Sequence, residues 1–390
     1  MATLNLPTAA RTFEPYTTGE PIVFDKAARP LPRVAFAAAH VVADPLAGND
    51  PWVENAIDWD ATMRFREHLW DLGLGVAEAM DTAQRGMGLG WSEAQTLIRH
   101  ALEAAKGRPD ALIACGAGTD HLPPGPDVTL DDVIRAYEEQ IGFVEGLGGR
   151  VILMASRALA AAAKSPDDYI AVYDRILSQV KEPVIIHWLG EMFDPALAGY
   201  WGSDDHFEAM TTALSVIKCH EDKVDGVKVS LLSKEKEVAM RKELPNPSGK
   251  PPRMYTGDDF NYAELIAGDG THYSDALLGI FDPIAPAAAA ALSALGRGSD
   301  NEFFDILAPT VPLSRHIFKA PTRFYKTGVV FVAYLNGFQD HFTMIGGQQS
   351  ARSLLHLTEI FKLADQARVL TDPDLAAARM NTVLAVHGLR

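Results

Sequence analysis

Residues 224–230, with the sequence VDGVKVS, form a short apolar run in which a single lysine, Lys228, lies among hydrophobic side chains. The run follows a segment with helical periodicity and precedes a longer polar segment, residues 231–252. This order predicts a strand of an alternating α/β chain, with Lys228 near the strand's C-terminal end. A lysine that is removed from water loses its proton readily, and the neutral amine can attack a carbonyl carbon. Two plainer interpretations stay open, a surface lysine on an edge strand or one partner of a buried ion pair.

The same pattern of an apolar, β-prone run followed by a helical segment recurs along most of the chain. Eight runs are predicted as strands, at residues 33–40, 74–80, 111–116, 150–155, 183–188, 224–230, 253–257 and 276–281. Their spacing of roughly 25 to 40 residues corresponds to one strand and one helix per unit. Because no glycine-rich nucleotide turn follows the first run, the pattern favours a (β/α)8 TIM barrel over an open doubly wound sheet.

Helical patterns occupy the segments between these runs. After Pro286 they occupy residues 287–295, 302–307, 327–338, 350–363 and 374–387. Thr129 with Asp132, for example, predicts a capping box at the start of one helix. The later helical segments predict a C-terminal α-helical extension. Its most apolar piece, residues 328–335, follows Tyr325 and Lys326, which we interpret as the polar end of a core helix. We therefore expect an α/β chain with an N-terminal arm (1–32), a barrel (33–296) and a C-terminal helical extension (297–390).

Composition narrows the class of protein. The chain has 390 residues, of which 47% are hydrophobic and 22% charged, so it has enough apolar material for a large core. Its formal net charge of −16 argues against nucleic acid or an anionic membrane as a partner. Cys115 and Cys219 are too few for a disulfide framework and are not spaced as a metal-binding pair, and neither a signal peptide nor a membrane-spanning stretch is recognised. We expect a soluble cytoplasmic protein.

In a TIM barrel the chemistry belongs at the C-terminal ends of the strands and in the loops that follow them. Polar residues and one glycine at these positions are the candidate site residues: His40, Glu78, Asp81, Thr82, Arg157, His187, Lys228, Gly257 and Asp258. Each also has a structural interpretation when it is taken alone. His40 could be a hydrogen-bonded rim histidine, Glu78 and Arg157 could form an ion pair, and Asp258 or Asp259 could cap the next helix.

The order of motifs resembles that of the dihydrodipicolinate synthase and N-acetylneuraminate lyase superfamily, and in particular a bacterial branch of proteins like dihydrodipicolinate synthase. The likeness extends over residues 33–286. Residues 224–228 (VDGVK) match the family's strand with its Schiff-base lysine, which falls on Lys228. Residues 183–187 (PVIIH) match a strand that ends in a proton-relaying tyrosine, and residues 255–259 (YTGDD) resemble the family's turn after strand seven. The resemblance implies a class I aldolase-like barrel.

The departures from the family pattern concern the substrate. The Gly-Thr-Thr turn that holds a keto-acid carboxylate in the family corresponds here to Asp81-Thr82-Ala83, and an aspartate there would repel a carboxylate. His187 stands in place of the tyrosine, and the arginine that follows it in the family has no counterpart in residues 189–192. We therefore expect imine chemistry to be retained and pyruvate not to be the substrate.

The leading hypothesis is a Schiff-base lyase or aldolase in which Lys228 attacks a ketone or aldehyde and His187 moves protons. Asp81, Thr82 and Arg157 would orient the compound, and a keto sugar or sugar acid would suit Asp81 and Glu78. No cofactor or metal is expected, the partner is a small carbonyl compound, and the family likeness suggests a homo-oligomer, either dimer or tetramer.

Two alternatives from other classes stay open. One is a metal-dependent sugar isomerase or epimerase that uses His40, Glu78, His187 and either Asp81 or Asp258 as ligands. The other is a barrel that binds a ligand without turning it over.

Overall fold

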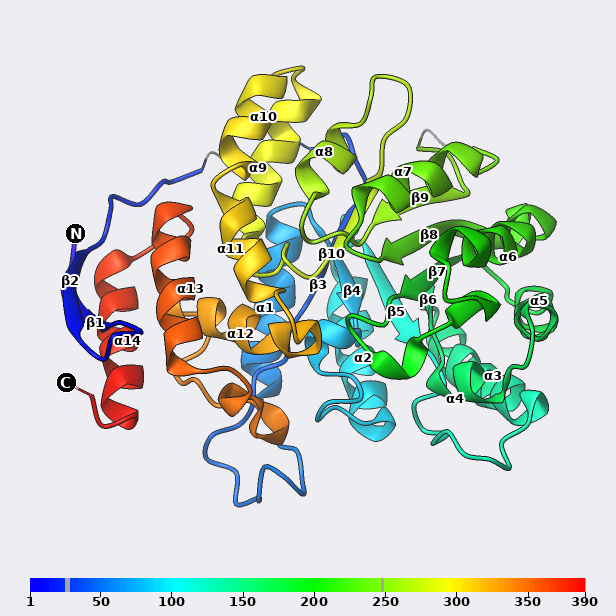
Figure 1. Cartoon of the computed structure of the whole chain (residues 1–390), viewed down its shortest axis with the longest axis horizontal. Coiled ribbons are helices and arrows are strands. Elements are labelled where there is room, and N and C mark those ends of the chain that lie inside the picture. Colours follow the sequence, from blue (N-terminus) through cyan, green and yellow to red (C-terminus); the bar gives the residue numbers. More distant parts are fainter. Residues whose placement is uncertain (25–28, 247–248, 390) are drawn as a thin grey trace.

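The structure of the chain is a computed structural model that describes residues 1–24, 29–246 and 249–389. Parallel strands close into a barrel whose last strand pairs with its first (Figure 1). In chain order the eight barrel strands are β3 (Ala35–Ala38), β4 (Gly75–Glu78), β5 (Ile113–Ala117), β6 (Val151–Met154), β7 (Val184–Leu189), β8 (Val224–Ser230), β9 (Arg253–Thr256) and β10 (Asp275–Leu278). All eight coincide with predicted runs, so the predicted TIM barrel is confirmed.

Helices cover the outside of the barrel, because each crossover between parallel strands has to return along the outer face. Those between and after the strands are α1 (Trp59–Asp71), α2 (Trp91–Lys106), α3 (Leu130–Gly146), α4 (Arg157–Ala162), α5 (Pro166–Leu177), α6 (His206–Cys219), α7 (Lys234–Glu243), α8 (Tyr262–Ala267) and α9 (Ala285–Gly296). Short 3-10 turns, of which η1 (Asp81–Ala83) and η2 (Pro195–Leu197) lie at the barrel mouth, join several of them. The predicted capping box of α3 is confirmed, with Thr129 and Asp132 bonded reciprocally.

The barrel interior is packed by alternate residues of the strands. Phe36, Ile152, Ile185, Tyr255 and Leu277 belong to this inner cluster. Because successive strand side chains point to opposite faces, the residues between them face the helices and join the larger outer core. This alternation decides which polar side chains reach the mouth.

The C-terminal extension packs beside the barrel mouth. Its helices are α10 (Asp300–Leu307), α11 (Thr310–Ile317), α12 (Tyr325–Leu335), α13 (Leu354–Gln366) and α14 (Pro373–Val386). Every residue of α12 is buried, because α11, α13, α14 and η1 of the barrel surround it. The helical extension is confirmed, although α11 lies outside the predicted segments.

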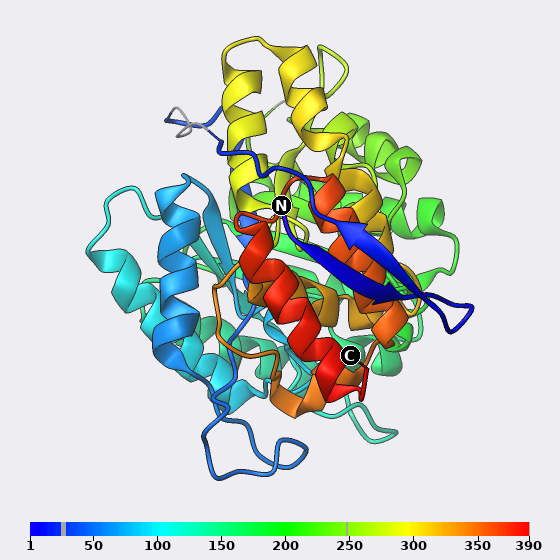
Figure 2. The same ribbon diagram turned by 90° about the vertical axis from the view of Figure 1, so that its left-hand side faces the viewer.

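The N-terminal segment forms a hairpin, β1 (Thr3–Pro7) with β2 (Phe13–Thr17), that was not predicted. It lies across α13 and α14, so both chain ends lie on the same side of the molecule (Figure 2). The Tyr16 hydroxyl donates to the Asp365 carboxylate over 2.8 Å, and the Gly19 amide donates to the same carboxylate. The hairpin therefore packs on the C-terminal extension and is hydrogen-bonded to α13, a contact that we call the clasp.

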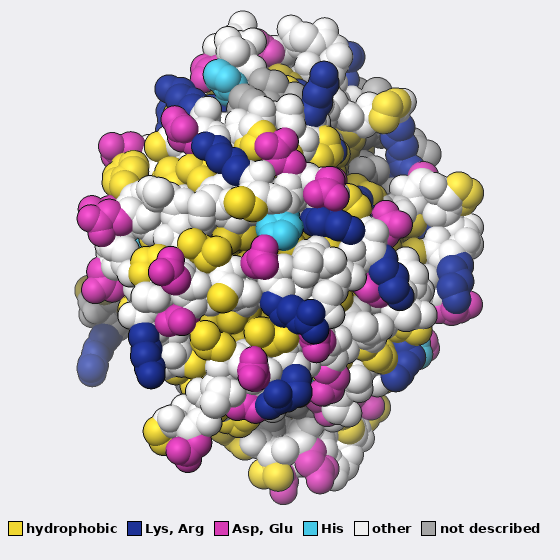
Figure 3. All heavy atoms as spheres, turned by 90° about the vertical axis from the view of Figure 1, so that its right-hand side faces the viewer, with side chains coloured by type: hydrophobic (Ala, Val, Ile, Leu, Met, Phe, Trp, Pro, Cys, Tyr) yellow, Lys and Arg dark blue, Asp and Glu magenta, His cyan; other side chains and the backbone are white. Residues whose placement is uncertain are grey.

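Among the described residues, no helix is both long enough and apolar enough to cross a membrane. On the face shown in Figure 3, lysines and arginines are interspersed with aspartates and glutamates, so opposite charges lie close together there.

Candidate active site

Lys228 and His187 lie side by side inside the C-terminal end of the barrel. They are partners in the register of β7 and β8. Ile185, two residues before His187, and Tyr255, which pairs with Lys228 from β9, both belong to the inner cluster. By alternation, the side chains of Lys228 and His187 also point inward. Both are buried, at 7% and 1% exposed.

Lys228 lines a small, narrow cavity at the C-terminal end of the barrel. In the described part of the chain, no side chain forms a hydrogen bond or ion pair with the Lys228 amine. Burial lowers the pKa of Lys228, and the charges of Asp81 and Asp259 oppose that shift. A buried amine with a lowered pKa is neutral in a larger fraction of molecules than an exposed lysine, and the neutral form is the nucleophile.

Gly257 is the residue that gives this lysine room. A Cβ at position 257 would lie 2.3 Å from the Ser230 Oγ and 2.9 Å from the Lys228 Cε. Both distances are shorter than real Cβ contacts, so any larger residue would displace the amine or the strand. Gly257 therefore belongs to the site through the space it leaves open.

Three further side chains of the small cavity, Thr82, Asp259 and Tyr325, carry groups that can hold or move a proton. Tyr325 enters from α12, and its hydroxyl bonds the Thr82 Oγ1 over 2.8 Å. Burial raises the pKa of Tyr325, so its hydroxyl stays protonated. Asp259 accepts a hydrogen bond of 2.8 Å from the Ile280 amide, and burial raises the pKa of Asp259 to about 7. A carboxyl with this pKa can both give and take a proton near neutrality.

His187 is held by the adjacent strand. Its Nε2 lies 3.3 Å from the Ser230 Oγ. Burial and the nearby charge of Lys228 lower the pKa of His187 well below its usual value, so the imidazole is neutral. In this state it can accept a proton or share one with Ser230.

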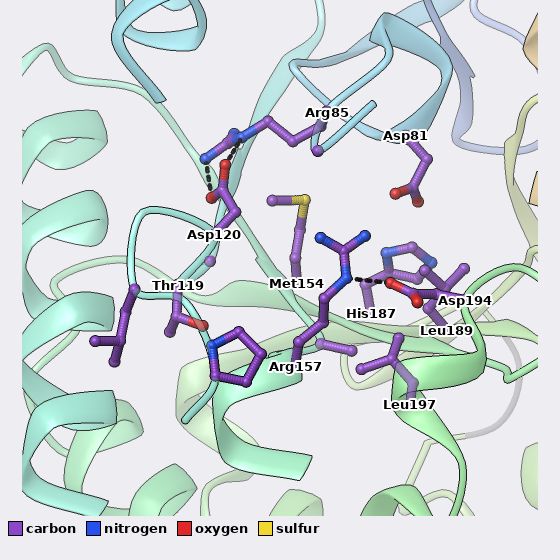
Figure 4. Close-up of a pocket in the computed structure, with 15 residues that line it drawn as sticks. Asp81, Arg85, Thr119, Asp120, Met154, Arg157, His187, Leu189, Asp194 and Leu197 are labelled. Atoms are coloured by element: carbon purple, nitrogen blue, oxygen red, sulfur yellow. Dashed lines mark hydrogen bonds and ion pairs between the residues drawn. The ribbon is translucent and has the colours of Figure 1, made fainter. Parts of the chain in front are cut away.

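A wider cavity opens outward from the inner one. Asp81 and Leu189 line both, so the two cavities adjoin each other. Figure 4 shows Asp81, Arg157 and His187 around the same space, with Arg85 opposite them and bonded to Asp120. Its two overlapping regions enclose about 610 and 630 Å³ of space, part of which is open to solvent.

Four of the seven residues predicted to bind substrate lie at the mouth. Asp81 lines every region of the cavity, and no hydrogen bond to its carboxylate is found among the described residues. Thr82 carries the bond to Tyr325, Gly257 makes room for Lys228, and Arg157 lines the wider cavity, where its Nε donates to Asp194.

The other three lie elsewhere, and we correct their assignment. Glu78 faces α1, where its carboxylate receives two 2.9 Å hydrogen bonds from Arg66 with both side chains fully buried. The Nδ1 of His40 bonds Asp282 over 2.8 Å in the core. The Asp258 carboxylate accepts from the Phe260 amide and from Asn261 at the start of α8. Each is engaged in a structural contact away from the cavity.

The site contains side chains that sequence reasoning missed. Tyr325 and Lys326 were assigned to the polar end of a core helix, yet both line the cavity. Asp259 lines the small cavity together with Lys228, whereas the sequence pattern predicts its neighbour Asp258 as the substrate-binding residue. The only signals in the sequence were the pair of polar residues before an apolar helix and the double aspartate after a strand.

The residues that the metal-dependent alternative requires as ligands do not lie together in the structure. Glu78 and His40 are turned away from His187, each with its own partner. Over the ranges that the structure describes, no group of three or more His, Cys, Asp or Glu side chains is arranged to hold a metal ion.

A family model described as "Protein of unknown function (DUF993)" matches residues 4–389. No curated protein matches the sequence. Similar solved structures include the dihydrodipicolinate synthase of Aquifex aeolicus, with a TM-score of 0.63 and 13% identity over 87% of this chain and 99% of that one. The enzyme of Acinetobacter baumannii, solved with pyruvate, has a TM-score of 0.61 and 14% identity over 86% and 99%. YagE of Escherichia coli K12, a prophage protein of the dihydrodipicolinic acid synthase family solved with pyruvate, has a TM-score of 0.59 and 12% identity over 92% and 100%. At these identities the likeness shows a shared fold.

Proposed function

The chain belongs to the DUF993 family and has the barrel fold of the dihydrodipicolinate synthases, and on this basis we propose that it is a Schiff-base lyase or aldolase acting through Lys228. One observation carries the proposal. The Lys228 amine lies inside the barrel mouth with a lowered pKa, it faces a cavity, and no partner holds it among the described residues. Buried ionisable groups without structural partners are typical of functional sites.

The chemical step begins with the neutral amine. The lone pair of the Lys228 nitrogen forms a bond to the carbonyl carbon of an aldehyde or ketone, giving a carbinolamine. The former carbonyl oxygen leaves as water after taking one proton from the nitrogen and one from an acid. Asp259 suits the role of this acid, because its pKa of about 7 leaves it partly protonated at neutral pH.

The resulting iminium accepts the electron pair of a breaking carbon–carbon bond. In carbon–oxygen cleavage it instead accepts the electron pair of the adjacent carbon–hydrogen bond, and the enamine so formed expels the oxygen together with the carbon–oxygen bonding electrons. A proton then has to reach or leave the carbon next to the imine. Tyr325, bonded to Thr82, and His187, bonded to Ser230, are both placed to relay it. His187 stands where the family pattern has a tyrosine, and Tyr325 brings a phenol to the cavity from the extension.

The shape of the cavity supports a polar, hydroxylated substrate. Asp81 faces both parts of the cavity, and its carboxylate can accept hydrogen bonds from hydroxyl groups. A carboxylate bound directly beside Asp81 would be repelled, as the comparison of motifs suggested. We retain as a prediction that the chain assembles as a dimer or tetramer, which sedimentation equilibrium would test.

Reductive trapping tests the proposal. The protein is incubated with a panel of aldehydes and ketones and with sodium borohydride, which reduces an iminium to a stable secondary amine. We expect a mass increase equal to that of the compound minus one oxygen atom, mapped by peptide sequencing to Lys228.

Lys106→Met serves as the control, because Lys106 is an exposed lysine of α2 that is paired with Glu103. It should still be labelled, whereas Lys228→Met should not. If no compound in a broad panel labels Lys228 in the folded protein, the imine mechanism is wrong, and a barrel that only binds its ligand becomes the better account.

A further inference from the structure

The wider part of the cavity is basic, in contrast to the chain as a whole. In the region that Lys326 lines, the described residues include Arg85, Arg157, Arg323 and Lys326 with two acids, Asp81 and Asp194; the overlapping region adds a third acid, Asp120, which is paired with Arg85. The whole chain has a formal net charge of −16. On the face shown in Figure 3 opposite charges are interspersed. A positive cavity in an acidic protein concentrates anions at that point.

Arg157 presents free donors to this cavity. Its Nε is taken up by Asp194, which fixes the plane of the guanidinium. The two terminal nitrogens point into the cavity in Figure 4 and form no hydrogen bond with a described residue. They lie over Gly86, where a Cβ would come within 2.9 Å of one of them. The planar fork of two N–H donors matches a carboxylate or a phosphate.

Lys326 is a second cation, and it lacks an acidic partner in the described part of the chain. It is 5% exposed, and its Nζ donates to the Arg323 carbonyl over 3.1 Å and to the Met87 sulfur over 3.5 Å. Burial lowers the pKa of Lys326 to about 8. A buried ammonium without a counter-ion is costly, and an anion in the cavity would remove that cost.

We propose that Arg157 and Lys326 bind a distal anionic group, a carboxylate or phosphate, of the substrate whose carbonyl reaches Lys228. The substrate class is then a short hydroxylated aldehyde or ketone with an acidic group at the end remote from the carbonyl. Asp81, between the two parts of the cavity, faces the hydroxylated middle. This inference rests on the proposed function and adds the chemistry of the other end of the substrate.

Matched pairs of carbonyl compounds test the inference. Glyceraldehyde 3-phosphate is compared with glyceraldehyde, and succinic semialdehyde with butyraldehyde, in borohydride trapping at neutral pH. We expect the anionic member of at least one pair to label Lys228 at a concentration roughly tenfold lower, which corresponds to one or two charge-assisted hydrogen bonds. The pair that shows the preference identifies phosphate or carboxylate as the group.

The variants Lys326→Met and Arg157→Gln should each remove most of this preference while the uncharged member still labels Lys228. Lys106→Met is the control, since Lys106 is exposed on α2 and paired with Glu103. It should leave the preference unchanged. Equal labelling by both members of both pairs in the natural protein overturns the inference, as does a preference that survives in both cavity variants.

A second measurement separates this inference from the imine mechanism. Isothermal titration with inorganic phosphate and with malonate reports anion binding without any covalent step. Binding that Lys326→Met and Arg157→Gln both weaken supports the anion site even if no compound labels Lys228. If neither anion binds the folded protein and no anionic preference is seen in trapping, the anion site is refuted.

The pH dependence supplies a further check. The charged groups that face Lys326 are Asp81, Arg157, Asp194 and Arg323. Its ammonium loses its proton as pH rises through about 8, so the anionic preference should fall between pH 7 and 9. Lys326→Arg should keep the preference at pH 9, because a guanidinium stays charged. A preference in the natural protein that is unchanged at pH 9 contradicts the role of Lys326.

Discussion

The two ends of strands β8, β9 and β10 differ in whether their buried ionisable side chains are paired with one another. At the N-terminal end, the Tyr255 hydroxyl donates to Asp225 over 2.6 Å, and Arg253 lies between Asp225 and Asp275 at 3.7 and 3.4 Å. Arg150 adds a further contact to Asp225 at 3.2 Å. Each charge there has an opposite neighbour.

At the C-terminal end of the same strands, the matching positions hold a lysine and two glycines. Lys228 has no hydrogen-bond partner among the described residues, and Gly257 and Gly279 leave the space that the lysine and Tyr325 occupy. One end of the barrel is closed by paired charges, and the other keeps a charged group unpaired beside a cavity. Under the proposed function, the first end contributes stability and the second contributes chemistry at some cost in stability.

Lys228→Met separates the two roles most sharply. The variant should form no borohydride-trapped adduct at position 228, because methionine has no amine. Its free energy of unfolding should rise by about 1 kcal/mol, since an apolar chain of similar length replaces a buried amine. Adduct mass and urea unfolding measure the two effects. A variant that loses stability would place Lys228 among the structural charges.

Asp225→Asn should give the opposite result. Removing the Asp225 charge leaves Arg253 with Asp275 as its remaining carboxylate, and the free energy of unfolding should fall by about 1–3 kcal/mol. Trapping at Lys228 should persist at temperatures where the variant is folded. Loss of trapping in a folded Asp225→Asn protein would show that the two ends are coupled.

Tyr325→Phe tests the proton relay at the mouth. The ring stays stacked on Phe318 at 4.3 Å, but the bond to Thr82 is lost. The rate of adduct formation should fall by about 10²-fold, a usual contribution of one general acid or base. Tyr262→Phe is the matched control, because the Tyr262 hydroxyl forms a 2.6 Å hydrogen bond with Thr310 at a position away from the cavity. The free energy of unfolding of this variant should fall by about 1 kcal/mol, and its rate of adduct formation should be unchanged.

Gly257→Ala should affect both the free energy of unfolding and adduct formation at Lys228. The new methyl group collides with Ser230 and with the Lys228 side chain, and such overpacking costs about 1–3 kcal/mol. Adduct formation should slow because the amine is displaced. Gly142→Ala on α3, where no atom lies within 4 Å of the new methyl group, should leave trapping unchanged and stabilise the helix by up to about 1 kcal/mol.

The last prediction concerns the pH dependence of stability that Asp259 causes. Its pKa is raised from an unfolded value near 4 to about 7, so the folded state binds the proton more tightly. Stability is therefore highest where both states are protonated and is lost as pH rises from about 4 to 7. Asp259→Asn should be more stable than the natural protein at pH 8, and the difference should shrink at pH 5. Thermal unfolding at both values checks this, and an equal difference at the two values would contradict it.

The strands were predictable because each is buried on both faces and appears in the sequence as a continuous apolar run. Lys228 was identifiable because it interrupts such a run. Glu78 was misplaced because the end of a strand does not state which face a side chain takes. In the structure its neighbour Ala77 faces the interior, so Glu78 turns toward Arg66.

Local sequence patterns do not predict contacts between residues that are far apart in the chain. Tyr325 meets Thr82 across 243 residues, and neither local periodicity nor motif spacing encodes that distance. The N-terminal hairpin was missed for the same reason, since its partner is α13 at the other end of the sequence. Each strand and helix unit of the barrel is encoded locally, whereas Arg323, Tyr325 and Lys326 reach the cavity from the C-terminal extension.

The clasp between the hairpin and α13 has a consequence for how the protein is made. Tyr16 and Asp365 are 349 residues apart. At ribosomal rates of roughly 5–20 residues per second, the hairpin emerges on the order of 20–70 s before its partner. The barrel strands are synthesised in the meantime and can fold first. Lys228 is thus synthesised before Tyr325, which covers the mouth, and the contact between Tyr16 and Asp365 can form only after both.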